Sequence, residues 1–216
     1  MRLGWLPNAL TIARCVFAGC VLAGFWQAMQ IDTLMMSEGE AASRQATLQQ
    51  LWYQFAFLAF LSGALTDFLD GWLARKLNAH SRFGIWLDPI ADKLLIAAAL
   101  FGLSVEFRSW LIYVPAAMII ARDIFMTWFR ATPRGRSAIV PSGLAKWKTG
   151  FEMAAIIGLM LPLAVLAEPL TPGAQPGISV FGILAVVAPV GLLWVAAGLS
   201  WVTAGQYMKV ASASPR

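Results

Sequence analysis

The chain has 216 residues, of which 59% are hydrophobic and only 12% are charged. Soluble domains usually carry roughly 25% charged residues, so this composition excludes an ordinary water-soluble domain. The net charge of +5 does not indicate nucleic-acid binding here. In so apolar a chain, basic residues more often set membrane topology and meet anionic lipid head groups.

Six long apolar segments follow one another, each close to the length that crosses a bilayer. They cover about 8–28, 50–76, 85–105, 109–131, 147–167 and 178–207. Backbone groups in lipid must pair within their own segment, so these spans are expected to be helices. The sequence predicts one all-α integral membrane domain over 1–216, with loops at 29–49 and 168–177.

The basic residues lie mostly on one side of these spans. With the N-terminus in the cytoplasm, 14 of the 16 Lys and Arg residues fall at cytoplasmic ends and loops, and only Arg44 and Arg108 fall on the other side. Such a bias follows the positive-inside rule. Both termini are therefore predicted to be cytoplasmic.

Four of the eleven acidic residues gather in one window at membrane depth or at its edge: Asp67, Asp70, Asp88 and Asp92. An ionised side chain there costs at least about 2.5–3.5 kcal/mol, so four together need a compensating partner. Spacings of three and four place each pair on one helix face. The short connection 77–84 makes the two helices antiparallel neighbours. Hard oxygen ligands in such a cluster suit Mg²⁺ or Mn²⁺.

Two further features surround this segment. Gly71 and Ala74 are small residues on the helix of the first pair, which lets a ligand or a neighbouring helix approach closely. Pro89 follows Asp88, so the third helix either starts there with Asp88 as its cap or kinks there.

The whole segment reads D-x2-D-G-x2-A-R-x8-G-x3-D-x3-D and resembles the motif of the CDP-alcohol phosphatidyltransferase family without a departure. Its eight positions are Asp67, Asp70, Gly71, Ala74, Arg75, Gly84, Asp88 and Asp92. The run from Leu6 to Arg14 is similar to the start of that family's first span. The run Ala145-Lys-Trp-Lys-Thr149 is similar to its phosphatidylglycerophosphate synthase branch. The resemblance covers roughly residues 5–165.

The resemblance implies six helices, two divalent metal ions and often a homodimer. It makes Asp67, Asp70 and Asp88 metal ligands, and Asp92 a proton acceptor that also touches the second metal. It implies a CDP-diacylglycerol site lined by Asn8, Ala9, Leu10, Thr11, Gly71, Ala74, Arg75 and Ser81. It also suggests a bacterial inner membrane, with the active site facing the cytoplasm.

For the acceptor, the sequence indicates an anionic substrate. Arg122 lies inside the fourth span, where an unpaired cation is costly, and Lys146 and Lys148 enter the fifth span from the same side. These cations would bind the phosphate of sn-glycerol 3-phosphate. The alternative is that Arg122 pairs with Asp123 or Glu152. Small departures from the branch pattern, at Ala145, Asp123 and Glu152, bear on the acceptor and leave the metal motif intact.

Other functions stay in competition. Within the family, phosphatidylglycerol (as in cardiolipin synthase), serine or inositol phosphate are alternative acceptors. Outside it, an acidic cluster in a membrane could belong to a divalent-cation transporter, but such proteins tend to show inverted repeats, and none is visible. A non-catalytic scaffold would have no use for four costly carboxylates.

Overall fold

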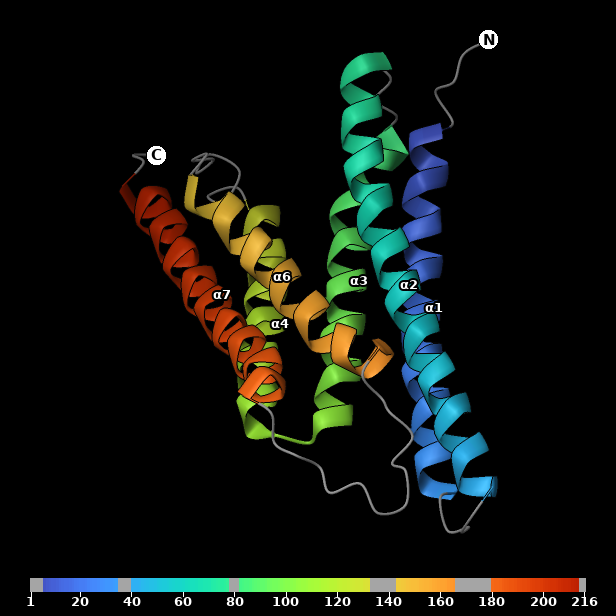
Figure 1. Cartoon of the computed structure of the whole chain (residues 1–216). Helices are drawn as coiled ribbons and strands as arrows, with labels where there is room; N and C mark the ends of the chain where they lie inside the picture. The colour runs from blue at the N-terminus through green and yellow to red at the C-terminus, as the bar shows by residue number, and fades with distance from the viewer. Residues whose placement is uncertain (1–5, 35–39, 78–81, 133–142, 166–179, 214–216) are drawn as a thin grey trace. The chain divides into compact units, whose positions relative to one another are not determined.

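The computed structural model describes residues 6–34, 40–77, 82–132, 143–165 and 180–213, with side chains for 9–31, 44–67, 69, 90–130, 132, 147–165 and 184–212. Within these ranges the chain forms six helices and no strand, which confirms the predicted all-α class (Figure 1). They are α1 (Leu6–Leu34), α2 (Glu40–Leu77), α3 (Arg82–Phe107), α4 (Trp110–Ala131), α6 (Gly143–Val165) and α7 (Val180–Ala213).

The sequence leaves open whether the predicted loop at 29–49 is ordered, and most of this segment is helical. Helix α1 continues to Leu34, and α2 already begins at Glu40. The stretch 40–50 contains neither Gly nor Pro and is rich in Ala, Gln, Leu, Glu and Arg, all strong helix formers. Its polarity therefore does not prevent helix formation. The predicted loop at 168–177 lies outside the described residues.

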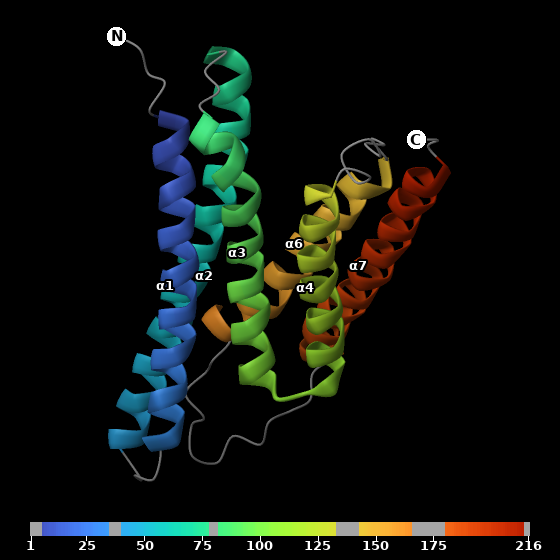
Figure 2. The same cartoon turned by 180° about the vertical axis from the view of Figure 1, so that it is seen from behind.

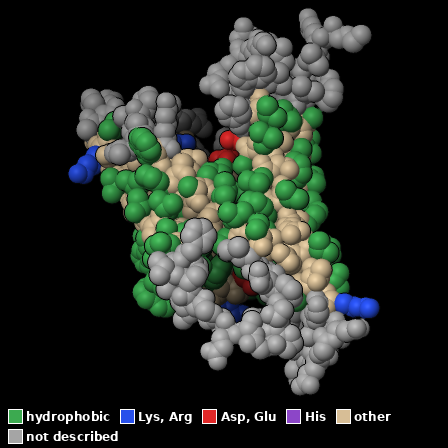
Figure 3. All heavy atoms as spheres, viewed as in Figure 1, with side chains coloured by type: hydrophobic (Ala, Val, Ile, Leu, Met, Phe, Trp, Pro, Cys, Tyr) green, Lys and Arg blue, Asp and Glu red, His purple; other side chains and the backbone are tan. Residues whose placement is uncertain are grey.

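Four of the described helical stretches are long and apolar enough to cross a bilayer: Ala9–Ile31, Trp110–Arg130, Trp147–Val165 and Leu184–Ser212. Large apolar side chains such as Leu58, Ile124 and Val187 are exposed, and hydrophobic side chains cover much of the described surface in Figure 3. Such an exterior suits lipid and would be a liability in water. The chain is thus an integral membrane protein, and spans through α2 and α3 stay a prediction.

Packing divides the chain into two compact units. The first holds residues 1–106 and 160–177, and the second holds 107–159 and 178–216. In the first unit α1 lies beside α2, as both views show (Figures 1 and 2). In the second, α4 packs against α7. The boundary falls inside α6, whose last residues belong to the first unit.

Glycines bring the helices of the first unit close together. A Cβ atom placed on Gly24 of α1 would lie 2.8 Å from the Cβ of Ala56 in α2. A Cβ on Gly63 of α2 would lie 2.7 Å from Cδ2 of Leu95 in α3. Small residues let helix backbones approach closely in membranes, where dispersion contacts supply much of the packing energy. Each of these glycines therefore fixes a point of contact between two helices.

In the second unit, α7 is anchored to α4 by indole hydrogen bonds. Trp194 Nε1 donates to the Leu111 carbonyl at 3.0 Å, and Trp201 Nε1 donates to the Met118 carbonyl at 3.2 Å. In each bond the donor residue lies 83 positions after the acceptor residue. Because this separation is the same in both bonds, the two helices run parallel. The bonds recur after seven residues, about two helical turns.

We predict that Gly24→Ala destabilises the protein, whereas Gly19→Ala does not. The new methyl at position 24 would meet Ala56 and also the Trp52 carbonyl oxygen at 3.0 Å, which is backbone and has little room to shift. Overpacking of this kind costs about 1–3 kcal/mol. Gly19, on the same helix, is the matched control, because a Cβ atom added there would meet no atom within 4 Å. Thermal unfolding in detergent measures both, and equal midpoints would contradict the α1–α2 contact.

Candidate metal and substrate site

The acidic pairs lie on two helices of the first unit. Asp67 and Asp70 are three residues apart within α2, and Asp88 and Asp92 are four apart within α3. The helical backbone at all four positions confirms that each pair shares one helix face. Helix α3 already begins at Arg82, so the alternative in which Asp88 caps a helix starting at Pro89 is wrong. The side chains of Asp70 and Asp88 lie outside the described residues.

The α1–α2 contact sets the level of the first acidic residue. Gly24 meets Ala56 where these two helices pass each other in opposite directions. Arg14 lies ten residues before Gly24, and Asp67 lies eleven residues after Ala56. At about 1.5 Å per residue, both side chains therefore reach the same height along the helix pair.

The α2–α3 contact places the second acidic residue at that height. Asp67 comes four residues after Gly63, and Asp92 comes three residues before Leu95, which is the partner of Gly63. Because these helices are antiparallel, the two steps lead in the same direction. The carboxylate-bearing positions 67 and 92 consequently lie at one level.

The α1–α3 contact gives the same result independently. A side chain on Gly102 of α3 would collide with the ring of Phe25 in α1. Arg14 lies eleven residues before Phe25, and Asp92 lies ten residues before Gly102, with both helices running the same way. Three helix contacts thus bring positions 14, 67 and 92 to a common level.

At this level Arg14 and Asp67 form an ion pair. Arg14 Nη1 donates to Asp67 Oδ1 at 2.9 Å. The Arg14 side chain is 1% exposed, whereas that of Asp67 is 46% exposed. The guanidinium is buried between helices and presents its charge to a carboxylate that remains open. Sequence reasoning missed this pair, although a cation inside an apolar span was a signal for a buried anionic partner.

The chemistry of this donor set fits a divalent metal ion. Asp92 is partly exposed at the same level as Asp67, and the other two acidic positions lie one turn away on the same two helices. Carboxylate oxygens are the ligands that Mg²⁺ and Mn²⁺ prefer. Among residues with described side chains, no group of three or more His, Cys, Asp or Glu gathers, and only two of the four acids belong to that set. Metal binding stays a prediction.

The predicted CDP-diacylglycerol residues are placed only in part. Thr11 is fully buried and lies three residues before Arg14, on the same face of α1. Ala9 and Leu10 are half-buried in the preceding turn. The structure therefore brings the N-terminal part of this set next to the Arg14–Asp67 pair. The remaining positions, whose side chains lie outside the described residues, are Asn8, Gly71, Ala74, Arg75 and Ser81.

The predicted acceptor residues form a second polar cluster, in the second unit. Arg122 is 8% exposed. It donates from Nε to the Ser200 carbonyl at 3.1 Å, from Nη2 to Thr203 Oγ1 at 3.2 Å and from Nη1 to Asp123 Oδ1 at 2.8 Å. All three nitrogens of the guanidinium thus have a protein partner. The ion pair between Arg122 and Asp123, one of the alternatives that the sequence offered, is therefore present.

Lys148 completes this cluster from α6. Its Nζ lies 3.4 Å from Asp123 Oδ1 and 3.4 Å from Glu152 Oε2. Lys148 and Glu152 are 8% and 1% exposed at the side chain, so the cluster is largely shielded from its surroundings. Sequence reasoning did not find Ser200 and Thr203 because a hydroxyl in an apolar helix gives no signal of its partner. The side chain of Lys146 lies outside the described residues.

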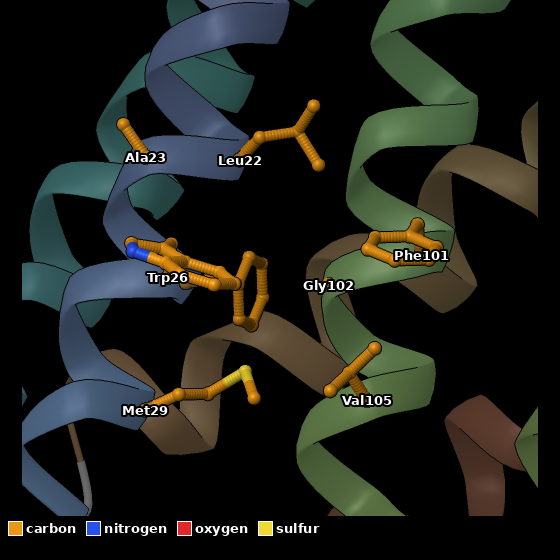
Figure 4. A pocket seen from close by; sticks show the side chains of 8 residues that line it. Leu22, Ala23, Trp26, Met29, Phe101, Gly102 and Val105 are labelled. Atoms are coloured by element: carbon orange, nitrogen blue, oxygen red, sulfur yellow. The ribbon is translucent and has the colours of Figure 1, made fainter.

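An apolar pocket of about 440 Å³ lies between α1 and α3 (Figure 4). In the figure Leu22 and Met29 of α1 reach toward α3, where Phe101 and Val105 line the opposite side, and Trp26 lies along α1. The pocket begins eight residues beyond Arg14, about 12 Å along the helix. Its lining offers apolar side chains only, so it suits hydrocarbon and lies apart from the carboxylates.

Comparison with known proteins places the chain in a family. A model of the CDP-alcohol phosphatidyltransferase family matches residues 4–204, which include both polar clusters. An Arabidopsis thaliana protein named CDP-diacylglycerol–glycerol-3-phosphate 3-phosphatidyltransferase 2 is 36% identical over 163 residues, covering 69% of this chain and 64% of the relative. The Escherichia coli K12 protein of the same name without the number is 37% identical over 140 residues, covering 63% of this chain and 74% of the relative. This chain thus spans slightly less than two thirds of the plant relative.

We predict that Asp123→Asn destabilises the second unit strongly. The substitution leaves Arg122 and Lys148 buried without the carboxylate that they share. Removing one partner of a buried charge group costs about 3–5 kcal/mol. Thermal or denaturant unfolding in detergent measures the loss.

The control for this prediction is a double variant. In Asp123→Asn/Lys148→Met, one of the two cations that contact Asp123 is removed together with the anion, so the loss of stability should be smaller than the sum of the two single losses. Strict additivity would mean that the 3.4 Å contact between Lys148 and Asp123 carries no energy.

Proposed function

We propose that this chain, which belongs to the CDP-alcohol phosphatidyltransferase family, transfers a phosphatidyl group from CDP-diacylglycerol to sn-glycerol 3-phosphate. The products are phosphatidylglycerophosphate and CMP, so the enzyme acts in phospholipid biosynthesis. The observation that carries the proposal is that Arg14 of α1 lies at one level with Asp67 and Asp92 on the two helices that hold the family motif. The names of the relatives support the choice of acceptor.

In the mechanism, Asp67, Asp70, Asp88 and Asp92 hold two Mg²⁺ or Mn²⁺ ions. When bound, these ions neutralise the pyrophosphate charge and stabilise the leaving oxygen. The acceptor hydroxyl oxygen forms a bond to the phosphorus that carries diacylglycerol, and the bond from that phosphorus to CMP breaks. Asp92 accepts the hydroxyl proton. Its place in α3, one turn beyond Asp88, keeps it near the metal ligands without making it buried.

The donor is bound from α1 and α2 in this proposal. Thr11 lies on the same face of α1 as Arg14, one helical turn nearer the helix start, and so lies about 4.5 Å from the level of the carboxylates. Asn8, Ala9 and Leu10 precede Thr11 in α1, and we assign Gly71, Ala74, Arg75 and Ser81 to the rest of the donor site. The diacylglycerol chains extend into lipid, since the helices of the first unit have apolar outer faces.

The acceptor phosphate is bound by Arg122, Lys146 and Lys148. Two of them, Arg122 and Lys148, lie together in a buried cluster, which supports a joint role. Their contacts differ: Arg122 holds Asp123 at 2.8 Å, whereas Lys148 lies at 3.4 Å from both of its carboxylates. An ammonium has three donors and binds phosphate as a point charge. Lys148 is therefore the more available cation, and Arg122 fixes the cluster to α7.

The cellular setting is part of the same proposal. The enzyme lies in a bacterial inner membrane as a homodimer, with its active site facing the cytoplasm. The distribution of 14 of 16 basic residues on one side supports this orientation. The carboxylate-bearing ends of α2 and α3 lie on that side in this proposal. The connection between these ends is shorter than the predicted 77–84, because α2 continues to Leu77 and α3 begins at Arg82.

We expect the purified full-length protein in detergent to release CMP from CDP-diacylglycerol only when Mg²⁺ or Mn²⁺ and sn-glycerol 3-phosphate are both present. Phosphatidylglycerol, serine and inositol phosphate, offered separately, serve as acceptor controls. Release with another acceptor alone would overturn the assigned acceptor and keep the family chemistry. Absence of release with every acceptor, from protein shown to be folded, would contradict the enzyme assignment and favour a cation transporter.

We expect Asp92→Asn to keep most of its affinity for Mn²⁺ but to lose turnover by about 10²–10⁴-fold, the usual contribution of a positioned base. The matched variant Asp67→Asn, which alters a metal ligand, should lose Mn²⁺ affinity as well. Initial rates at saturating Mn²⁺ and a separate Mn²⁺ titration give the two quantities. Wild-type turnover in Asp92→Asn would remove the base assignment.

A further inference from the structure

We propose that Arg14 is a positioning residue for the Asp67 carboxylate and thereby sets the metal affinity of the site. The inference rests on the proposed function, because it takes Asp67 to be a metal ligand. It adds a residue from α1 to a site whose acidic residues lie on α2 and α3. The carrying observation is the 2.9 Å contact between Arg14 Nη1 and Asp67 Oδ1.

The packing of α1 fixes where the guanidinium lies. Gly24 holds α1 against Ala56 of α2, and Phe25 of the same helix lies against Gly102 of α3. Helix α1 is thus in contact with both helices that carry the carboxylates. Arg14 itself is 1% exposed, so its long side chain has little freedom to take another direction. The charge is therefore held at a set point beside the acidic residues.

Arg14 contacts one oxygen of the Asp67 carboxylate, and the Asp67 side chain is still 46% exposed. A carboxylate has two oxygens, so a hydrogen bond at Oδ1 restricts the rotation of the group and leaves Oδ2 for a second partner. In metal sites, groups that orient a ligand in this way change metal affinity or activity by about 10–100-fold when they are removed. This is the role that the contact gives to Arg14.

Two electrostatic effects act in opposite directions. The guanidinium repels an incoming divalent cation, and its removal on this ground alone would tighten metal binding. It also offsets part of the mutual repulsion of four neighbouring carboxylates and keeps one of them oriented. Four acidic residues lie on α2 and α3 near Arg14, so we expect the site to stay attractive to cations with Arg14 present. The main effect of removing Arg14 is therefore that the Asp67 carboxylate is no longer held in one orientation.

The planar fork of arginine matters to this role. Lysine keeps the charge but presents a compact, strongly hydrated ammonium on a flexible stem, which orients a carboxylate less well. Arg14→Lys therefore separates charge from geometry. Arg14→Gln removes the charge and keeps a polar head. Arg44→Gln is the control, because Arg44 is an exposed cation of α2 that lies 23 residues before Asp67.

The test is a Mn²⁺ titration of the purified full-length protein in detergent, with free Mn²⁺ followed by electron paramagnetic resonance. We expect Arg14→Gln to raise the Mn²⁺ dissociation constant by about 10–100-fold. Arg14→Lys should raise it by less, and Arg44→Gln should leave it at the wild-type value. In parallel, CMP release by Arg14→Gln should recover at high Mn²⁺, since the acidic residues are intact.

The outcomes divide clearly. Unchanged or tighter Mn²⁺ binding in Arg14→Gln, with or without a lower unfolding temperature, would overturn the positioning role and leave the proposed reaction standing. If Arg14→Gln does not fold, Arg14→Lys decides, and wild-type Mn²⁺ affinity in that variant overturns the role of the fork. Failure of the wild-type protein to bind Mn²⁺ would overturn this inference together with the metal part of the proposed function.

Discussion

The constraint on which the structure depends is that a charge inside an apolar bundle must find its partner within the bundle. An isolated ion at membrane depth costs at least about 2.5–3.5 kcal/mol, and water is not at hand to compensate. Arg14 meets Asp67 at 2.9 Å, and Arg122 meets Asp123 at 2.8 Å. Both arginines are almost completely buried. Arg14 links α1 to α2 through Asp67, and Arg122 links α4 to α7 through its bonds to Ser200 and Thr203. The same requirement that stabilises the fold thus gathers the ionisable groups into two places.

Helix packing turns the spacing of the sequence into the geometry of the first site. Gly24 against Ala56, Gly63 against Leu95, and Gly102 against Phe25 are three contacts between apolar residues that take no part in chemistry. Each nevertheless fixes the register of one pair of helices, and the three registers agree on one level for positions 14, 67 and 92. A shift of one turn in any pair would move a carboxylate by about 5.4 Å, more than the length of an ion-pair contact. The small residues are therefore as much a condition of the site as the acids are.

The helices could be predicted from the sequence, but the residues that Arg14 and Arg122 contact on other helices could not. Long apolar runs predicted six helices, and the i, i+3 and i, i+4 spacing of the acids predicted two shared faces, because both inferences use only the local period of a helix. Whether the segment 29–49 is ordered was left open by its polarity, and the helix propensity of its residues decides that most of it is helical. Arg14 with Asp67, and Arg122 with Ser200 and Thr203, join residues 53, 78 and 81 positions apart. Such contacts depend on helix register, which one sequence does not encode in any local pattern.

The two clusters differ in how ready they are for a ligand. At the first, a half-exposed Asp67 shares only one oxygen with Arg14, and the neighbouring acids leave an excess of negative charge that a cation would satisfy. At the second, Arg122 and Lys148 face Asp123 and Glu152, so with all four ionised the cluster is neutral. A neutral cluster exerts little attraction on a phosphate from a distance. Binding there requires either that Lys148 exchanges its 3.4 Å contacts for the phosphate or that Lys146 adds its charge. The exchange by Lys148 costs little free energy because its contacts are long. Arg122, in contrast, would have to break three shorter hydrogen bonds to bind the phosphate. If this cluster is the acceptor site that we propose, discrimination between phosphate and uncharged alcohols rests on the lysines, while Arg122 keeps Asp123 and α7 in place.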